Sequence, residues 1–208
     1  MKYRFFFRKS SFKKDRSNAE ILLNLILKYK PKNFLEVGVL EGVTSKNVCE
    51  LLYKFHGSQF KFIGIDLFGI DIDKNNEKEF TPISTKYSNP LKYIYFNYIF
   101  KYHPNSFEGV KKFLKKYSKS ISLYKGYSHE ILEKIDISFI DFVFLDAGHS
   151  YNSVSKDLNL LINKLKKNSI IVCDDYNILH YGVKRAVDEL KVNYDIKDLG
   201  RFALINIK

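Results

Sequence analysis

Hydrophobic positions along the chain fall mainly into short continuous runs instead of strict alternation. The clearest runs lie at residues 34–37, 60–66, 139–145 and 170–173. Continuous apolar runs of this length predict strands that are buried on both faces, as in a parallel sheet. A shorter run at residues 121–124 predicts another strand between the second and third of these.

Between the predicted strands, apolar residues recur at helical spacing. This spacing predicts helices over residues 18–29, 44–53, 106–116, 129–135, 153–166 and 181–190, and Ser17-x-x-Glu20 has the form of a capping box before the first helix. The chain closes with residues 194–199, a turn at Gly200 and residues 202–207, a pattern typical of a hairpin. We therefore predict an α/β fold: a Rossmann-like three-layer sandwich whose seven-stranded sheet is mostly parallel, with an antiparallel C-terminal hairpin.

The pattern breaks down over residues 69–105, which are rich in Phe and Tyr. A stretch of this length between two regular elements is typical of a lid or a small insertion. Its aromatic residues suit either packing onto the domain or a wall of a substrate site, and the sequence leaves both open. With 208 residues, we expect residues 1–208 to form a single domain that carries this insertion.

Composition changes this picture little. The formal net charge of +12 suits nucleic acid in principle, but the lysines are scattered, so we expect a solvated basic surface and no nucleic-acid partner. Cys49 and Cys173 lie in apolar contexts and are expected to be small buried hydrophobic residues. No uncharged apolar run is long enough to span a membrane or to form a signal-peptide core. Because the two cysteines are not expected to form a disulfide, a reducing cytoplasm is the expected location.

Acidic residues follow the predicted strands. The first, second, fourth and fifth strands end on Glu36, Asp66, Asp146 and the pair Asp174-Asp175. The carboxyl ends of parallel strands line the crevice in which ligands of α/β proteins bind, so we expect these acids to surround one site. After the first strand, Gly38 and Gly42 form a turn in which a ligand can approach the backbone closely before the next helix.

Four acids and one histidine carry the candidate chemistry. Asp66 suits a ribose hydroxyl pair, and its alternative role is a helix N-cap. His149 follows Asp146 by three residues and could take a proton from a hydroxyl, unless it is a structural histidine. Asp146, Asp174 and Asp175 could bind Mg²⁺, but adjacent residues of a strand point to opposite faces, so both aspartates can contribute only where the chain leaves the strand.

The ordered set of motifs resembles a known family. Glu36-Val-Gly-Val-Leu-Glu-Gly42-x-Thr-Ser, Asp66, Asp146-x-x-His149-Ser-Tyr, Asp174-Asp175-Tyr and Gly182-Val-Lys-Arg-Ala-Val-Asp-Glu-Leu190 are similar to those of class I S-adenosylmethionine (SAM)-dependent methyltransferases. Within that class, the chain looks most like the small-molecule O-methyltransferases that act on catechols and macrolide sugars. The resemblance covers residues 20–208 apart from the aromatic insertion.

The resemblance implies roles for individual residues. The cofactor would be SAM, with Glu36, Gly38, Gly42 and Ser45 around its methionine part, Asp66 and Leu67 at the ribose, Tyr127 and Ser128 at the adenine, and Asp146 beside them. Metal-dependent relatives bind Mg²⁺ through acids at the positions of Asp146, Asp174 and Asp175. His149 and Asp146 would be catalytic, although catechol-type enzymes carry a lysine at the position of His149.

The expected function is therefore O-methylation of a small molecule, with a sugar hydroxyl preferred over a phenol, either with or without Mg²⁺, and a homodimer is the candidate oligomer. Three alternatives remain at this point. An NAD-dependent oxidoreductase shares the sheet, but its loop normally reads Gly-x-Gly-x-x-Gly. A nucleic-acid methyltransferase suits the charge but lacks the Asn/Asp-Pro-Pro-aromatic segment. A binding module without activity would not need the complete set of acids.

Overall fold

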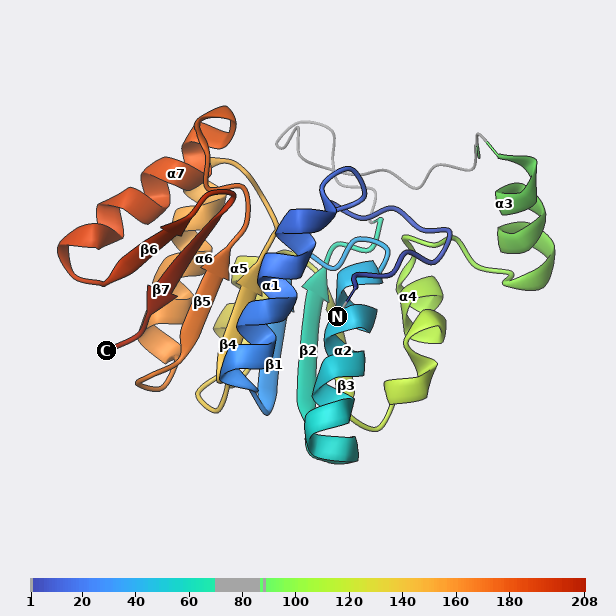
Figure 1. Cartoon of the computed structure of the whole chain (residues 1–208), viewed down its shortest axis with the longest axis horizontal. Helices are drawn as coiled ribbons and strands as arrows, with labels where there is room; N and C mark the ends of the chain where they lie inside the picture. The colour runs from blue at the N-terminus through green and yellow to red at the C-terminus, as the bar shows by residue number, and fades with distance from the viewer. Residues whose placement is uncertain (1, 70–86, 88) are drawn as a thin grey trace.

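The strands of the chain form one seven-stranded sheet in the order β3-β2-β1-β4-β5-β7-β6, as seen in a computed structural model that describes residues 2–69, 87 and 89–208 (Figure 1). Neighbouring strands pair in parallel except β7, which runs antiparallel to both β5 and β6. The predicted mostly parallel sheet with an antiparallel C-terminal hairpin is confirmed. The strands are β1 (Asn33–Val37), β2 (Lys61–Asp66), β3 (Ile121–Lys125), β4 (Phe142–Leu145), β5 (Ile170–Cys173), β6 (Ile196–Leu199) and β7 (Phe202–Asn206).

Helices cover both faces of this sheet, which gives the predicted three layers (Figure 1). Each of the six helices predicted from spacing is present, with ends that differ by a few residues: α1 (Arg16–Tyr29), α2 (Val43–His56), α4 (Phe107–Phe113), α5 (Ser128–Lys134), α6 (Tyr151–Lys164) and α7 (Tyr181–Asp188). Short 3-10 turns follow or precede several of them: η1 (Gly57–Gln59), η3 (Lys115–Tyr117), η4 (Ile178–His180) and η5 (Glu189–Val192).

Two hydrophobic cores, one on each face, explain the continuous apolar runs. On one face α1 and α2 pack on the sheet, where the Phe34 ring stacks between those of Phe62 and Phe142 at centroid distances of 5.8 and 5.2 Å. On the other face α5, α6 and α7 pack on residues such as Leu35 and Val143. Because successive strand residues point to opposite faces, burial on both faces requires apolar side chains at every position.

The predicted capping box at the start of α1 is wrong. The N-cap is Asp15, whose carboxylate accepts a hydrogen bond from the Asn18 backbone N–H. Ser17 lies inside the helix and donates its hydroxyl to Asp15 Oδ1 at 2.6 Å. A carboxylate is as good an N-cap as a hydroxyl, and here it lies two residues earlier, so the helix begins at Arg16.

Residues 2–15, which we call the N-terminal arm, cross the edge of the sheet at which the strands end (Figure 1). Arg8 anchors the arm: it is 2% exposed, and its Nη1 donates to the carbonyl oxygens of Glu41 and Pro104 at 2.9 and 2.7 Å. Its guanidinium lies over the Phe113 ring at 4.1 Å. The arm is thereby fastened to the glycine loop and to α4.

The aromatic-rich segment at 69–105 lies partly outside the described residues. Its described part includes α3 (Pro90–Ile94) and the π-helix η2 (Tyr95–Ile99), of which Phe96 is buried. Large apolar side chains of these two helices are exposed, and so is that of the neighbouring Tyr102. In the helices they are Leu91, Tyr93, Ile94, Tyr98 and Ile99. The lid function predicted for this segment stays a prediction.

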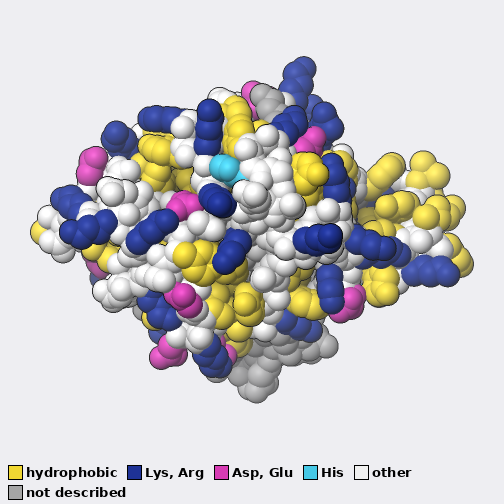
Figure 2. All heavy atoms as spheres, turned by 90° about the horizontal axis from the view of Figure 1, so that it is seen from below, with side chains coloured by type: hydrophobic (Ala, Val, Ile, Leu, Met, Phe, Trp, Pro, Cys, Tyr) yellow, Lys and Arg dark blue, Asp and Glu magenta, His cyan; other side chains and the backbone are white. Residues whose placement is uncertain are grey.

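The basic residues are dispersed on the face that Figure 2 shows, with acidic and apolar side chains between them. This agrees with the scattered lysines of the sequence. Among the described residues, no helix combines the length and apolarity that a membrane span requires.

Candidate active site

A cavity of about 320 Å³ opens at the carboxyl ends of β1, β2 and β4. It lies between the glycine loop after β1, the residues after β2, the start of α5 and the loop between β4 and α6. Of the predicted site residues, the cavity brings together Gly38, Asp66, Leu67, Tyr127, Ser128, Asp146, His149 and Asp175. Of the acids predicted to surround one site, Asp66, Asp146 and Asp175 line the cavity, whereas Glu36 and Asp174 are buried and do not.

Gly38 is required immediately after β1, where the backbone passes close to the residue that follows β4. Its φ is +95°, and a Cβ built there would lie 1.8 Å from the carbonyl oxygen of Asp146. The Gly38 N–H donates to the Ile65 carbonyl at 2.9 Å, which holds the loop against β2. The glycine therefore serves the close approach of two loops at the cavity as well as the turn.

Asp66, at the end of β2, holds the same loop by hydrogen bonds to its backbone. Its Oδ2 accepts from the backbone N–H groups of Val39 and Leu40 at 2.7 and 2.8 Å, and its Oδ1 accepts from the Phe68 N–H at 2.7 Å. Burial raises the pKa of this carboxyl. The carboxylate caps the glycine loop instead of a helix, and it also lines the cavity.

Glu36, Gly42 and Ser45 do not line the cavity. Glu36 is fully buried at the end of β1, where burial raises its pKa to about 8 and Ser45 Oγ donates to its Oε2. Its Oε1 has no hydrogen-bond partner among the described residues. Gly42 has φ +75° and begins α2. These three residues support the glycine loop on its side away from the cavity.

On the adenine side of the predicted site, Tyr127 and Ser128 open α5. Ser128 Oγ donates to Asp157 Oδ2 of α6 at 2.6 Å, which ties the two helices together beside the cavity. Tyr127 stands at the N-cap position, with its ring 5.7 Å from that of His129. Both predicted residues are therefore at the cavity wall.

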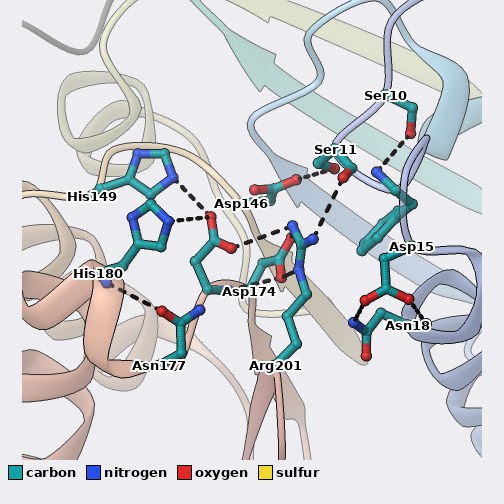
Figure 3. Close-up of polar contacts among 12 residues, drawn as sticks. Ser10, Ser11, Asp15, Asn18, Asp146, His149, Asp174, Asn177, His180 and Arg201 are labelled. Carbon is teal, nitrogen blue, oxygen red and sulfur yellow. Dashed lines mark hydrogen bonds and ion pairs between the residues drawn. The ribbon is translucent and has the colours of Figure 1, made fainter.

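At the other end of the cavity, Asp146 faces the N-terminal arm. Its Oδ2 accepts from Ser11 Oγ at 3.0 Å (Figure 3). Burial, reinforced by the carboxylates of Asp174 and Asp175, raises the pKa of Asp146 well above its usual range. A cationic group in the cavity would relieve this repulsion, so Asp146 suits a positively charged ligand.

His149 and His180 lie side by side (Figure 3), and both face Asp175. His149 Nε2 lies 2.9 Å from Asp175 Oδ2 and His180 Nε2 lies 3.8 Å from the same oxygen, with the two rings 4.5 Å apart. Burial alone would raise the pKa of Asp175, but the hydrogen bond from His149 and the charge of Arg201 lower it. Asp175 is therefore ionised and orients the imidazole of His149.

The predicted metal ligands are brought together, but they are already bound to a side chain. Oxygens of Asp146, Asp174 and Asp175 lie within 4.8 Å of one another, because Asp175 has φ +55° and the chain leaves β5 there. However, Arg201 donates Nε and Nη2 to the two oxygens of Asp174 at 2.5 and 2.6 Å. With both Asp174 oxygens occupied by a cation, this arrangement does not fit Mg²⁺.

Sequence reasoning missed Arg201 and Ser11. Arg201 could have been found from topology, since β5 pairs antiparallel with β7 and the register Cys173↔Ala203 brings the start of β7 beside Asp174. For Ser11 no local signal exists. It lies 135 positions from Asp146, and only the path of the N-terminal arm brings them together.

Comparison with known proteins identifies the family. A sequence model described as a methyltransferase domain matches residues 35–176, more than half of the chain. The chain therefore belongs to the methyltransferase domain family, which confirms the class predicted from its motifs. No curated protein matches the chain by sequence.

Solved structures show the same fold at low sequence identity. An SAH-bound methyltransferase from Podospora anserina has 15% identity and a TM-score of 0.63, over 93% of this chain and 79% of that one. An O-methyltransferase from Bacillus cereus in complex with SAH has 12% identity and a TM-score of 0.61, over 96% and 84%. The O-methyltransferase TomG from Streptomyces achromogenes, involved in tomaymycin synthesis and in complex with SAM, has 14% identity and a TM-score of 0.59, over 93% and 81%.

Proposed function

We propose that this chain is a SAM-dependent O-methyltransferase that acts on a hydroxyl of a small molecule. The observation that carries the proposal is the cavity of a methyltransferase-family fold in which the His149–Asp175 pair stands beside Asp146. The similar structures described above were solved with SAM or SAH, which supports the choice of cofactor.

The cavity has the chemistry that such a cofactor needs. When bound, SAM supplies a methyl group activated by a sulfonium. Asp66 at one wall offers carboxylate oxygens to ribose hydroxyls, and Asp146 at the other offers negative charge to the cationic methionine end. Glu36, Gly42 and Ser45 keep the glycine loop in shape from behind, so their proposed contribution is indirect.

His149 is the proposed general base. Because Asp175 is an acceptor, it fixes the tautomer in which His149 Nε2 carries the proton and Nδ1 is basic. Nδ1 would then accept the proton of the acceptor hydroxyl, which would be held facing the activated methyl group that SAM supplies when bound. Holding oxygen, methyl and base in this geometry supplies much of the rate, and the base adds roughly 10²–10⁴-fold.

The experiment that tests this function is transfer of a labelled methyl group from SAM to a panel of sugar and phenol acceptors. We expect His149→Ala to lower kcat by about 10²-fold or more while leaving the Kd for SAM nearly unchanged. His56→Ala is the matched control, because His56 does not line the cavity and lies beside the Phe55 ring and the backbone carbonyls of residues 30 and 31. Full turnover by His149→Ala on an acceptor that the wild type methylates would contradict the assignment.

A sugar hydroxyl is the preferred acceptor and a phenol the second, and both rest on the resemblance to the O-methyltransferase branch. Oxidoreductase and nucleic-acid chemistry have no comparable support. In the labelled-methyl assay, the acceptor class is the one whose product retains the label. The homodimer proposed from the sequence is tested separately, by the mass of the purified chain in solution.

A further inference from the structure

We propose that the guanidinium of Arg201 occupies the place of a divalent cation among Asp146, Asp174 and Asp175, so that the acceptor site works without a metal. The claim about the acceptor site rests on the function proposed above. The claim about cation binding does not, because it concerns only which cation the three carboxylates hold.

The guanidinium of Arg201 contacts two of the carboxylates at once. Arg201 makes a two-pronged contact with Asp174, Nε to Oδ1 at 2.5 Å and Nη2 to Oδ2 at 2.6 Å, and its Nη2 also lies 3.3 Å from Asp175 Oδ1 (Figure 3). This fork matches a carboxylate in a way that a point charge cannot. One cation thereby contacts two of the three carboxylates that a metal would need.

Asp174 is not accessible to a metal ion from the cavity. The Asp174 side chain is 1% exposed and does not line the main cavity, whereas Asp146 and Asp175 do. A metal entering from the cavity would therefore have to remove Arg201 from a buried carboxylate. Removing one partner of a buried ion pair is strongly unfavourable, because the other charge stays behind without compensation.

Arg201 is held in place from several sides. Its side chain is only 18% exposed, and its guanidinium lies 4.9 Å from the centre of the buried Phe12 ring. Its carbonyl oxygen accepts from the Tyr176 N–H at 2.8 Å. The β6–β7 hairpin and the N-terminal arm thus fix the arginine against the end of β5.

In this arrangement each of the three acids has a different role. Asp174 is neutralised by Arg201 and positions it, which leaves Asp175 to orient His149 and Asp146 to face the cavity. Lowering of the acceptor hydroxyl's pKa by direct metal ligation is then unnecessary, because His149 takes the proton. Arg201 is a positioning residue here, since it contacts the acids and not the cavity.

The direct test is titration of the purified full chain with MnCl₂, monitored by the electron paramagnetic resonance of free Mn²⁺. We expect the wild type to leave the free signal unchanged. We expect Arg201→Gln, which removes the charge, to bind one Mn²⁺ at least about tenfold more tightly, because three carboxylates then face one another without a cation. Asp174→Asn added to Arg201→Gln should abolish the gained binding, and Arg201→Lys, which keeps the charge but loses the two-pronged contact, should bind Mn²⁺ less tightly than Arg201→Gln.

Two results would overturn the proposal. One is a wild-type chain that binds one equivalent of Mn²⁺ as tightly as Arg201→Gln, and the other is a folded Arg201→Gln variant that binds no more tightly than the wild type. If circular dichroism shows that Arg201→Gln has unfolded, the wild-type titration together with Arg201→Lys decides the matter.

A second measurement addresses the acceptor site. Wild-type methyl transfer should run at the same rate in EDTA as in MgCl₂, and a rate lost in EDTA and restored by MgCl₂ would overturn the metal-free site. If the proposed function itself fails, no methyl transfer occurs under either condition, and the Mn²⁺ titration still tests the place of Arg201.

Discussion

At the scale of single residues, Glu36 shows how strongly the fold changes an ordinary carboxyl. It lies at the end of a strand that is buried on both faces, and its only hydrogen-bond donor among the described residues is Ser45 Oγ. Burial raises its pKa to about 8, so the folded protein retains a proton that the unfolded chain releases near pH 4.5. Glu36 is therefore a source of pH-dependent stability.

The prediction concerns Glu36→Gln, which mimics the protonated carboxyl. Below pH 4.5 the acid is protonated in both states and has no effect on stability. Between pH 4.5 and 8 only the unfolded chain loses the proton, so the wild type is destabilised as the pH rises, by up to about 5 kcal/mol at 1.36 kcal/mol per pKa unit. Urea unfolding at several pH values should show that the free energy of unfolding of Glu36→Gln rises relative to that of the wild type between pH 4.5 and 8. A difference that is constant with pH would refute the shifted carboxyl.

Gly38 is the residue that the loop geometry cannot replace. Gly38→Ala adds a Cβ 1.8 Å from the Asp146 carbonyl oxygen at a φ of +95°, so we expect a loss of stability of about 3 kcal/mol or more. Gly57→Ala is the control: its φ is also positive, at +60°, but a Cβ there meets nothing within 4 Å. Its cost should be only that of the backbone conformation, about 1–2 kcal/mol. Equal losses in urea unfolding would show that the contact with Asp146 does not matter.

The sequence located some site residues and not others, for a physical reason. Gly38 and Asp146 immediately follow β1 and β4, Asp66 ends β2, and His149 lies three residues after Asp146. Strand ends are visible in the hydrophobic pattern. Arg201 and the N-terminal arm reach the site through long-range pairing, which no local pattern records. For Glu36 the pattern gave the right place at the strand end, but its side chain lies behind the loop and not in the cavity.

At the scale of elements, the N-terminal arm is one part whose structure the sequence did not predict, and the helices α3 and η2 are another. Its short apolar run carries no periodicity, and its position depends on Arg8, whose guanidinium donates to the carbonyl oxygens of Glu41, Pro104 and Gly109. By contrast, the strands and the six predicted helices each have their own pattern of burial. The start of α1 was misplaced because two polar side chains, Asp15 and Ser17, could cap it and Asp15 does.

Arg8→Ala should detach the arm. The change leaves three carbonyl oxygens and the faces of Phe96, Phe100 and Phe113 without the guanidinium that they contact, so we expect a loss of about 3 kcal/mol in the free energy of unfolding. Lys14→Ala, an exposed cation of the same arm, should change stability by less than about 0.5 kcal/mol. Urea unfolding measures both. Similar losses for the two variants would mean that Arg8 does not anchor the arm.

At the scale of the whole molecule, the strand order places the acids on one edge. β1 lies between β2 and β4, so the ends that carry Glu36, Asp66 and Asp146 are neighbours, and β5 adds Asp174 and Asp175 beside them. The fold class followed from the alternation of strands and helices, whereas this order did not. It depends on the crossovers between the strands, which no local pattern in the sequence records.

The central claim is that the cavity between β1, β2 and β4 holds SAM. Isothermal titration calorimetry of the purified chain tests it most directly, with NAD as the competing cofactor. We expect one molecule of SAM per chain, no binding of NAD, and loss of SAM binding in Gly38→Ala, with Gly57→Ala binding as the wild type does. A wild-type chain that binds no SAM, or that binds NAD in its place, would contradict it.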